Sequence, residues 1–350
     1  MLQQLTAALV IFLTTYVFTL MTGYALNAKN KLLQTYKISA DPYIYIFGIL
    51  SLTLIGVFIF TPAFNDSIVP MRASFLITNL IFAALIYIVF LTDIKKLLLP
   101  TIFASSVISA FLFINPDSLP EIVYIPKPLQ ILCIGLFMGL VTFSAKLMAG
   151  ITGVFSLCFS MASLGLILIS YAGGLPVISG LMATALFGIF VSVFLFNRYE
   201  TNLIINEGAM MSLAFVFCTL ICQGINELAA PSIFILVVYF LIELTWSVLR
   251  QYLLHKREPE LFFNTFYFSC AQKGLALISI HTMLFKLCIV NIILALFELH
   301  MPNAFTLPIF AVVINCWLLS KMYNIEPQPV ENLEQKTKSN SGRKKHSKKA

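Results

Sequence analysis

The chain has 350 residues, of which 59% are hydrophobic and 11% are charged, and its mean hydropathy is +0.93. Soluble domains carry roughly 25% charged residues, so this composition excludes a soluble domain and indicates a membrane protein that crosses the bilayer several times. The formal net charge of +7 includes a basic run near the carboxyl terminus. No folded module surrounds that run, and we therefore do not expect nucleic-acid binding.

Continuous apolar runs, separated by polar or Gly/Pro breaks, predict membrane-spanning helices. A helix crosses a bilayer in about 20 apolar residues, whereas the strands of a β-barrel would alternate apolar and polar positions. We therefore expect an all-α helical bundle embedded in the membrane, with about eleven transmembrane helices. The expected spans are residues 5–26, 43–60, 73–91, 97–114, 128–143, 154–171, 175–196, 209–224, 230–249, 275–297 and 304–320.

The basic residues predict the orientation of these spans, because Lys and Arg are retained on the cytoplasmic side. With the amino terminus outside and the carboxyl terminus in the cytoplasm, nearly all of the 22 Lys and Arg residues fall in cytoplasmic segments. The exceptions are Arg72 and Lys127 in outer loops and Lys286 within a span. We expect a multi-pass protein of the inner (plasma) membrane with its site on the cytoplasmic face.

The two ends of the chain differ in character. The first apolar run is too long for a signal-peptide core, so we expect it to remain as a membrane helix. Residues 1–322 are expected to form the membrane-embedded domain, and residues 323–350 a disordered basic cytoplasmic tail. Two roles stay open for the tail: a solvated segment that sets the orientation, or a segment that binds anionic lipids.

Polar residues gather in the cytoplasmic segments, where a site could form. Asp93 lies beside two lysines at the end of the third span, and Lys146 precedes Gly150 and Gly153, two glycines placed just before a helix. Such glycines let backbone N–H groups approach an anion at a helix amino terminus. A plain structural explanation also exists, because charges commonly end helices and glycine is frequent in membrane helices.

The stretch FNRYETNLIINEGAMMSLAF, residues 196–215, joins two apolar runs through a short polar loop. Asn197 stands near its start, and Glu207 follows ten positions later, where the next apolar run begins. A carboxylate at a membrane surface can hold a cation through its oxygens, and that cation can in turn hold a phosphate. We expect the site to be organised around this stretch.

Three ionisable residues fall within the predicted spans. Glu243 and His281 each lie six residues from a cytoplasmic end, about 9 Å deep at 1.5 Å per residue, and could pair with each other. Lys286 lies near mid-membrane, where an ionisable group is costly and becomes a functional candidate. The alternatives are a satisfied Glu243–His281 pair with a lysine stem that reaches the surface, or a polar path of the kind that a transporter needs.

Four cytoplasmic segments together resemble the motifs of one family: FLTDIKKLLLP, KLMAGITGV, the stretch at 196–215, and FFNTFYFSCAQKG. The chain is similar to the polyprenyl-phosphate N-acetylhexosamine-1-phosphate transferases, integral membrane enzymes that begin lipid-linked cell-envelope glycans. The resemblance covers roughly residues 73–320 and includes the number and the sidedness of the spans.

The resemblance assigns family positions to residues of this chain. Glu207 stands at the aspartate that binds magnesium, Asp93 at the second acid of a paired-aspartate motif, and Asn197 at a family asparagine. The remaining matches are Gly150 and Gly153 at two motif glycines, Lys146 at a motif asparagine, and Lys273 with Gly274 at the end of a histidine motif. Thr92, Ala149 and Thr152 replace family acids, and the histidines of the last motif are absent.

The resemblance implies a transferase that moves a sugar-1-phosphate from a UDP-sugar to a polyprenyl phosphate in contact with membrane lipids. It implies Asp93 and Glu207 as the catalytic acids and as ligands of a magnesium ion. It implies that the substrates bind to Lys146, Gly150, Gly153, Asn197 and Lys273. The missing acids keep an alternative open, namely altered chemistry, or a non-catalytic scaffold or a transporter on the same fold.

Overall fold

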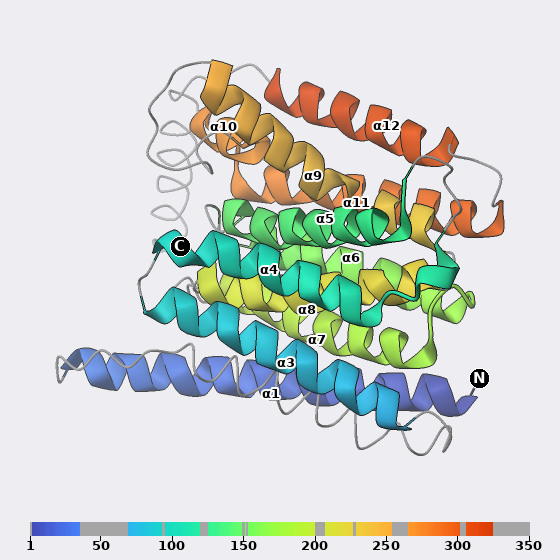
Figure 1. The fold of residues 1–350 in the computed structure, drawn as a ribbon. Coiled ribbons are helices and arrows are strands. Elements are labelled where there is room, and N and C mark those ends of the chain that lie inside the picture. Colours follow the sequence, from blue (N-terminus) through green and yellow to red (C-terminus); the bar gives the residue numbers. More distant parts are fainter. Residues whose placement is uncertain are drawn as a thin grey trace, which may run out of the picture.

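The computed structural model describes residues 2–35, 69–92, 95–119, 125–148, 151, 153–199, 207–226, 229–253, 265–301 and 306–324. These residues fold as helices and their connections, and no strand occurs among them. The helices, labelled as in Figure 1, are α1 Leu2–Thr35, α3 Val69–Leu91, α4 Lys95–Phe113, α5 Lys127–Met148, α6 Val154–Tyr171, α7 Val177–Tyr199, α8 Glu207–Asn226, α9 Ala230–Leu253, α10 Phe266–Gln272, α11 Leu277–His300 and α12 Thr306–Tyr323, with a 3-10 turn η2 at Pro116–Ser118.

The expected all-helical membrane bundle is confirmed. Within the described ranges, nine helices are long and apolar enough to cross a bilayer, and α3 contains a shorter apolar stretch, Ile77–Phe90. Ten predicted spans coincide with a helix, while the predicted span at 43–60 lies outside the described residues, as does most of the predicted tail. Helix α1 continues to Thr35, beyond its apolar run, because that extension is rich in Ala, Lys, Leu and Gln, which favour helix.

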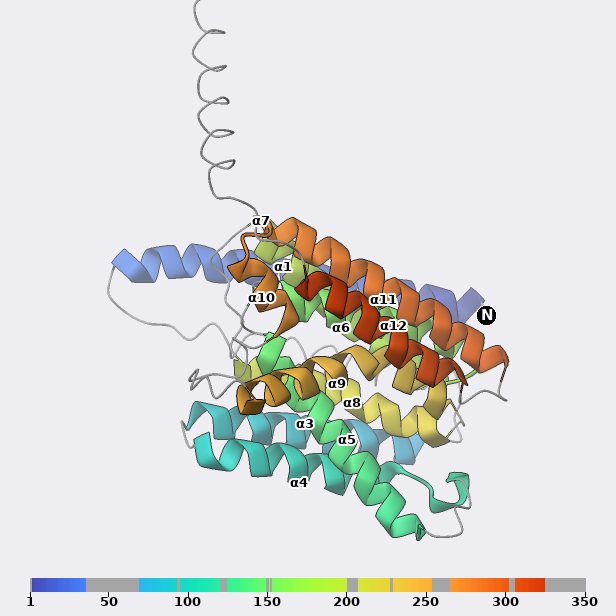
Figure 2. The same ribbon diagram turned by 90° about the horizontal axis from the view of Figure 1, so that it is seen from above.

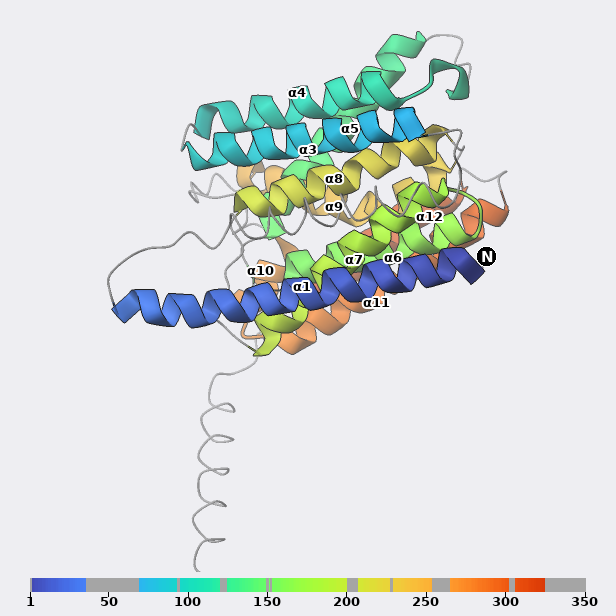
Figure 3. The same cartoon turned by 90° about the horizontal axis from the view of Figure 1, so that it is seen from below.

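Helix α8 occupies the centre of the bundle. It contacts α3, α4 and α5 on one side and α6, α7 and α9 on the other, as Figures 2 and 3 show. Of its span 94% is buried, against 22% for α12 at the edge of the bundle. A helix that is apolar around nearly its whole circumference needs such a central position. In the run from Ala209 to Cys222 the polar side chains are Ser212 and Thr219, and both hydroxyls donate to carbonyls of α8.

Two connections near the candidate site differ in how well the sequence predicted them. The break between α5 and α6 is present as expected, with Gly153 immediately before α6 at a φ of 86°. Only glycine adopts this left-handed conformation without strain. The polar stretch at 196–215 is more helical than expected, because α7 continues to Tyr199 and α8 begins at Glu207.

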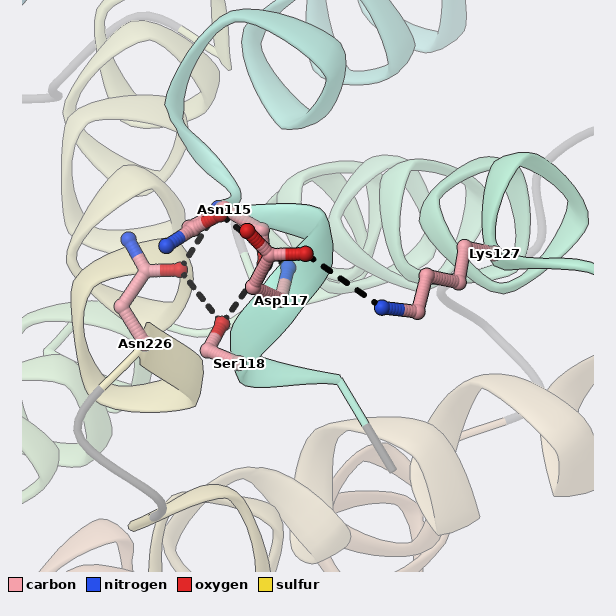
Figure 4. A network of polar contacts seen from close by, with 5 residues as sticks. All are labelled: Asn115, Asp117, Ser118, Lys127 and Asn226. Carbon is pink, nitrogen blue, oxygen red and sulfur yellow. Dashed lines mark hydrogen bonds and ion pairs between the residues drawn. The ribbon is translucent and has the colours of Figure 1, made fainter. Parts of the chain in front are cut away.

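A polar clasp joins α8 to the connection between α4 and α5 (Figure 4). Asn226, the last residue of α8, accepts hydrogen bonds at Oδ1 from the N–H of Asn115 at 2.9 Å and from the hydroxyl of Ser118 at 3.2 Å. The ammonium of Lys127, the first residue of α5, lies 3.5 Å from the carboxylate of Asp117. These contacts hold one end of the antiparallel α5–α8 pair together.

Candidate functional site

The candidate residues lie at the opposite end of the bundle from this clasp. Because successive helices run in opposite directions, the ends of α3, α5 and α7, the beginning of α8 and the α10–α11 junction meet at the left of Figure 1. Along α5, Lys146 is about 28 Å from Lys127 at 1.5 Å per residue, close to the roughly 30 Å of a hydrocarbon core. The two polar ends of the α5–α8 pair are therefore separated by about one bilayer.

Lys146 and Glu207 form the polar contact that defines this end. The Lys146 ammonium lies 3.7 Å from a carboxylate oxygen of Glu207, and their side chains are 43% and 38% exposed. Glu207 is the first residue of α8, where the positive end of the helix dipole favours a negative charge. Both groups are partly open to solvent, so the pair is accessible to a ligand that carries negative charge or a metal ion.

The end of α3 packs against the beginning of α8. A Cβ atom added at Gly208 would lie 2.6 Å from the Phe90 ring, so glycine is what allows this close approach. The Ser212 hydroxyl, one turn further along α8, donates a hydrogen bond to the Ala83 carbonyl of α3 at 3.0 Å. These contacts bring the end of α3, the helix that precedes Asp93, beside the start of α8 at Glu207. Asp93 itself and Gly150 lie outside the described residues.

Gly153 is buried and lies beneath the imidazole ring of His281 on α11. A Cβ atom at this position would be 3.1 Å from His281 Cε1 and 3.2 Å from Nε2. The ring of Phe194, on α7, meets the His281 ring edge to face with centroids 5.4 Å apart. Glycine at position 153 therefore has two reasons: the backbone is left-handed there, and a side chain would crowd the His281 ring.

A groove of about 950 Å³ runs from this histidine along α6, α7 and α11. Gly153 and His281 line one end, and the remainder is largely apolar, with Leu157, Phe187 and Phe285 among its walls. This volume lies at the upper end of the range for small-molecule sites, which are commonly lined by apolar side chains with a few polar groups. The groove is suited to a long apolar chain that carries a polar head.

Asn197 and Lys273 lie at the same end of the bundle but in different surroundings. Asn197 belongs to the last turn of α7. Lys273 ends α10, and its ammonium donates a hydrogen bond to the carbonyl of Tyr323, the last residue of α12, while lying 4.8 Å from the centre of that tyrosine ring. Lys273 therefore stabilises the carboxyl end of α12, where backbone carbonyls lack helical partners.

Helix α10 was not predicted, yet it connects several elements of this end. The Tyr267 hydroxyl donates a hydrogen bond to the Leu147 carbonyl beside Lys146, and the Cys270 thiol contacts the Met322 carbonyl of α12. Burial raises the pKa of the Cys270 thiol to about 11. Thr265 caps this helix by accepting a hydrogen bond from the N–H of Phe268. A Thr directly before the aromatic run 266–268 is the weak sequence signal that could have indicated the helix.

Glu243 and Arg250, both on α9, also contact α10. A carboxylate oxygen of Glu243 accepts a hydrogen bond from the N–H of Phe266 at 2.7 Å, and its other oxygen has no hydrogen-bond partner among the described residues. The sequence suggested that Glu243 could pair with His281. In the structure the backbone N–H of Phe266 is the hydrogen-bond donor to Glu243 instead. The Arg250 guanidinium donates to the hydroxyl of Ser269.

The residues expected to hold magnesium are only partly within the described structure. No group of three or more His, Cys, Asp or Glu side chains that could hold a metal occurs in the described part of the chain. One carboxylate oxygen of Glu207 lies 3.7 Å from the Lys146 ammonium, and the Glu207 side chain is partly exposed, so a ligand can reach the carboxylate. Magnesium is often held by one or two carboxylates together with water and phosphate oxygens, so Glu207 fits one position of such a site.

No protein-family model matches the chain, and a search of curated proteins finds no significant sequence match.

Proposed function

We propose that this chain is a membrane transferase that moves a sugar-1-phosphate from a UDP-sugar to a polyprenyl phosphate, in a lipid-linked pathway of cell-envelope glycan synthesis. In this proposal about eleven helices cross the plasma membrane, with the amino terminus outside and the carboxyl terminus inside. The end of the bundle that carries Lys146 and Glu207 then faces the cytoplasm, where nucleotide sugars are available.

The observation that carries the proposal is the ion pair of Lys146 and Glu207 at a solvent-accessible end of the central helix pair. Transfer of a sugar phosphate to a lipid phosphate brings several negative charges together, which must be offset. In our proposal the Lys146 ammonium attracts the diphosphate of the donor, and Glu207 would be one carboxylate ligand of a magnesium ion. Bound magnesium would offset the phosphate charges and orient the donor.

The groove beside His281 supports the same proposal from the side of the lipid substrate. A polyprenyl chain is long and apolar, and the groove along α6, α7 and α11 has walls of matching character. Its polar end, at Gly153 and His281, is where the phosphate of such a lipid would lie. We assign Gly150 and Asn197 to the donor side, and Lys273 to positioning the end of α12, because its ammonium is bound to the Tyr323 carbonyl.

The test uses the purified full chain in detergent with polyprenyl phosphate, magnesium and a panel of UDP-sugars. UMP release and the mass of the lipid product are followed for the wild type, Glu207→Gln and the control Asp117→Asn. Asp117 belongs to the other exposed Asp/Glu–Lys pair in the described structure, at the far end of the bundle. We expect a lipid-diphosphate sugar from the wild type and Asp117→Asn, and none from Glu207→Gln. Product from Glu207→Gln at the wild-type rate would overturn the role of the pair.

The groove has its own test. Thr282 of α11 lines it and is exposed, and its hydroxyl donates a hydrogen bond within the helix to the Ile278 carbonyl at 2.7 Å, so Thr282→Phe narrows the groove without displacing a buried side chain. We expect a raised KM for polyprenyl phosphate and an unchanged KM for the UDP-sugar. Ala104→Phe adds the same ring to an exposed position of α4 and is the matched control.

A second candidate is a non-catalytic membrane protein on the same scaffold, which includes a transporter that uses Lys286. The same ion pair favours it, because Lys146 can neutralise Glu207 and simply join α5 to α8. A folded wild type that gives no product with any donor, and whose thermal stability falls in Glu207→Gln, would support this candidate.

A further inference from the structure

A second cavity, of about 730 Å³, lies between α11 and the end of α12 and is separate from the proposed transferase site. Its walls include Lys286 and Leu287 of α11 together with Trp317, Ser320 and Lys321 of α12. Two ammonium groups thus face one cavity. None of the described residues that line it is acidic.

Lys286 is an unusual residue for its position. It lies in α11, about 14 Å from Leu277 at 1.5 Å per residue, and its side chain is exposed at the edge of the bundle. In the described part of the chain it has no ion-pair or hydrogen-bond partner. The last two turns of α12 line the same cavity, so Lys286 is level with the end of that helix. A charged group that faces lipid is costly unless it meets an opposite charge or water.

The neighbouring side chains are of the kinds found at the boundary between hydrocarbon and headgroups. The Lys321 ammonium lies 4.0 Å from the centre of the Trp317 ring, and Trp317 is 55% exposed. Tryptophan is enriched at membrane interfaces, and lysine stems commonly extend toward headgroups. The apolar residues Met283, Leu287 and Leu318 complete the wall and offer contact to an acyl chain.

Two sets of contacts hold the cavity in shape. Asn291 on α11 and Asn315 on α12 exchange side-chain hydrogen bonds of 3.2 and 2.7 Å, and both residues are buried. At the end of α12, Lys273 and Arg250 approach the Tyr323 ring, at 4.8 and 5.4 Å from its centre. The end of α12 is therefore surrounded by basic side chains, and the four acids of the described residues (Asp117, Glu207, Glu243 and Glu298) do not line this cavity.

We infer that this cavity binds the phosphate of an anionic phospholipid, with Lys286 and Lys321 as its ligands. The two ammonium groups offset the phosphate charge, while the apolar wall contacts the first part of an acyl chain. The site is independent of the transferase proposal, because it uses different residues on different helices.

The chain permits a direct optical test, because it contains only two tryptophans. Trp246→Phe leaves Trp317 of the cavity as the sole indole fluorophore. The full-length variant is reconstituted in phosphatidylcholine bilayers that contain either dibrominated phosphatidylglycerol or dibrominated phosphatidylcholine, whose bromine atoms quench a nearby indole. We expect saturable quenching by the anionic lipid in excess of that by the zwitterionic lipid.

Charge variants made in the Trp246→Phe protein assign the effect. Lys286→Gln and Lys321→Gln should each weaken the preference for phosphatidylglycerol by about fivefold, as expected for one basic residue near an anionic surface. Lys127→Gln, at the far end of α5, should leave it unchanged. The basic tail is the same in all variants, so a difference between them reports the cavity. Equal quenching by the two lipids, or an unchanged preference in both lysine variants, would overturn the inference.

Two further arms cover other sources of phosphate and a failure of the tryptophan variant. Inorganic phosphate added to the same vesicles should not reverse the quenching, and reversal would assign the cavity to free phosphate. Native mass spectrometry of the wild type and Lys286→Gln with phosphatidylglycerol needs no tryptophan substitution. Equal retention of phosphatidylglycerol by the two proteins there would contradict the proposal.

Discussion

Lys146 and Glu207, on helices that are distant in sequence, lie 3.7 Å apart at one end of the α5–α8 pair. The other end of the same pair is closed by Asn226, whose side chain binds the connection between α4 and α5. Each end has its own ion pair, since Lys127 and Asp117 lie at the far end, but only the end with Lys146 and Glu207 also has left-handed Gly153 and the polar end of the apolar groove. This asymmetry leads us to place the proposed chemistry at Lys146 and Glu207.

Charge variants of this pair should separate activity from stability. An ion pair with two half-exposed partners contributes about 0–1 kcal/mol, so we expect Lys146→Gln or Glu207→Gln to change the free energy of unfolding by no more than that. Transferase activity should be lost in Glu207→Gln. The swapped double variant Lys146→Glu/Glu207→Lys keeps an ion pair but places each charge against a helix dipole, so we expect its unfolding midpoint to stay below that of the wild type and the protein to be inactive. Recovery of activity in the swap would show that the pair acts only through packing.

Gly153→Ala should destabilise the protein by more than Gly173→Ala does. Both glycines have a φ of 86°, and a left-handed conformation costs an alanine about 1–2 kcal/mol. A methyl group at position 173 has no neighbour within 4 Å, whereas at position 153 it meets the His281 ring. Thermal unfolding of the two variants in the same detergent measures the difference between their losses of stability. Because the backbone cost is the same at both positions, this difference reports the crowding of His281 alone. Equal midpoints would mean that His281 moves freely.

The buried amide pair between α11 and α12 should contribute measurably to stability. Asn291→Leu leaves the Asn315 side chain without its partner, and we expect a loss of about 0.5–2 kcal/mol, the range found for hydrogen bonds between membrane helices. The double variant Asn291→Leu/Asn315→Leu removes both polar groups and should recover part of the loss. Unfolding midpoints of the three proteins test this. A double variant with the summed loss of the two single variants would argue against coupling.

Cys270 should react slowly with maleimides in the folded protein. Because burial raises the pKa of its thiol to about 11, about one molecule in a thousand carries the thiolate at pH 8. Labelling of the Cys270 peptide, followed by mass spectrometry, should rise about tenfold per pH unit and quicken on unfolding, where the pKa returns to about 8.5.

The same shift predicts a loss of stability at alkaline pH. Since the folded state retains this proton between about pH 8.5 and 11, the contribution of the Cys270 thiol to stability is complete below that window. It falls as the pH rises through the window. Cys270→Ala should show a weaker alkaline decline in its unfolding midpoint. An identical decline in the wild type and in the variant would assign the effect to other groups.

The helices were predictable from the sequence because the bilayer acts as a uniform solvent along the chain. Every span must contain about 20 apolar residues, and this requirement can be read without knowledge of any partner. For the same reason the break before Gly153 was evident. The span predicted at 209–224 lies within α8, which begins two residues earlier at Glu207. The predictions were least accurate where an apolar run ends, as at Thr35 and Tyr199, because helix propensity extends beyond the membrane limit.

The contacts between helices were decided only by the tertiary structure. Hydropathy says that a segment is buried in lipid or in protein, but not which face meets which neighbour, because lipid and leucine are equally apolar. Three contacts depend on how the helices pack: Lys146 with Glu207, His281 over Gly153, and the hydrogen bond from the Phe266 N–H to Glu243. The sequence by itself determined an all-helical membrane protein with polar segments at helix ends. Packing determined which of those segments meet.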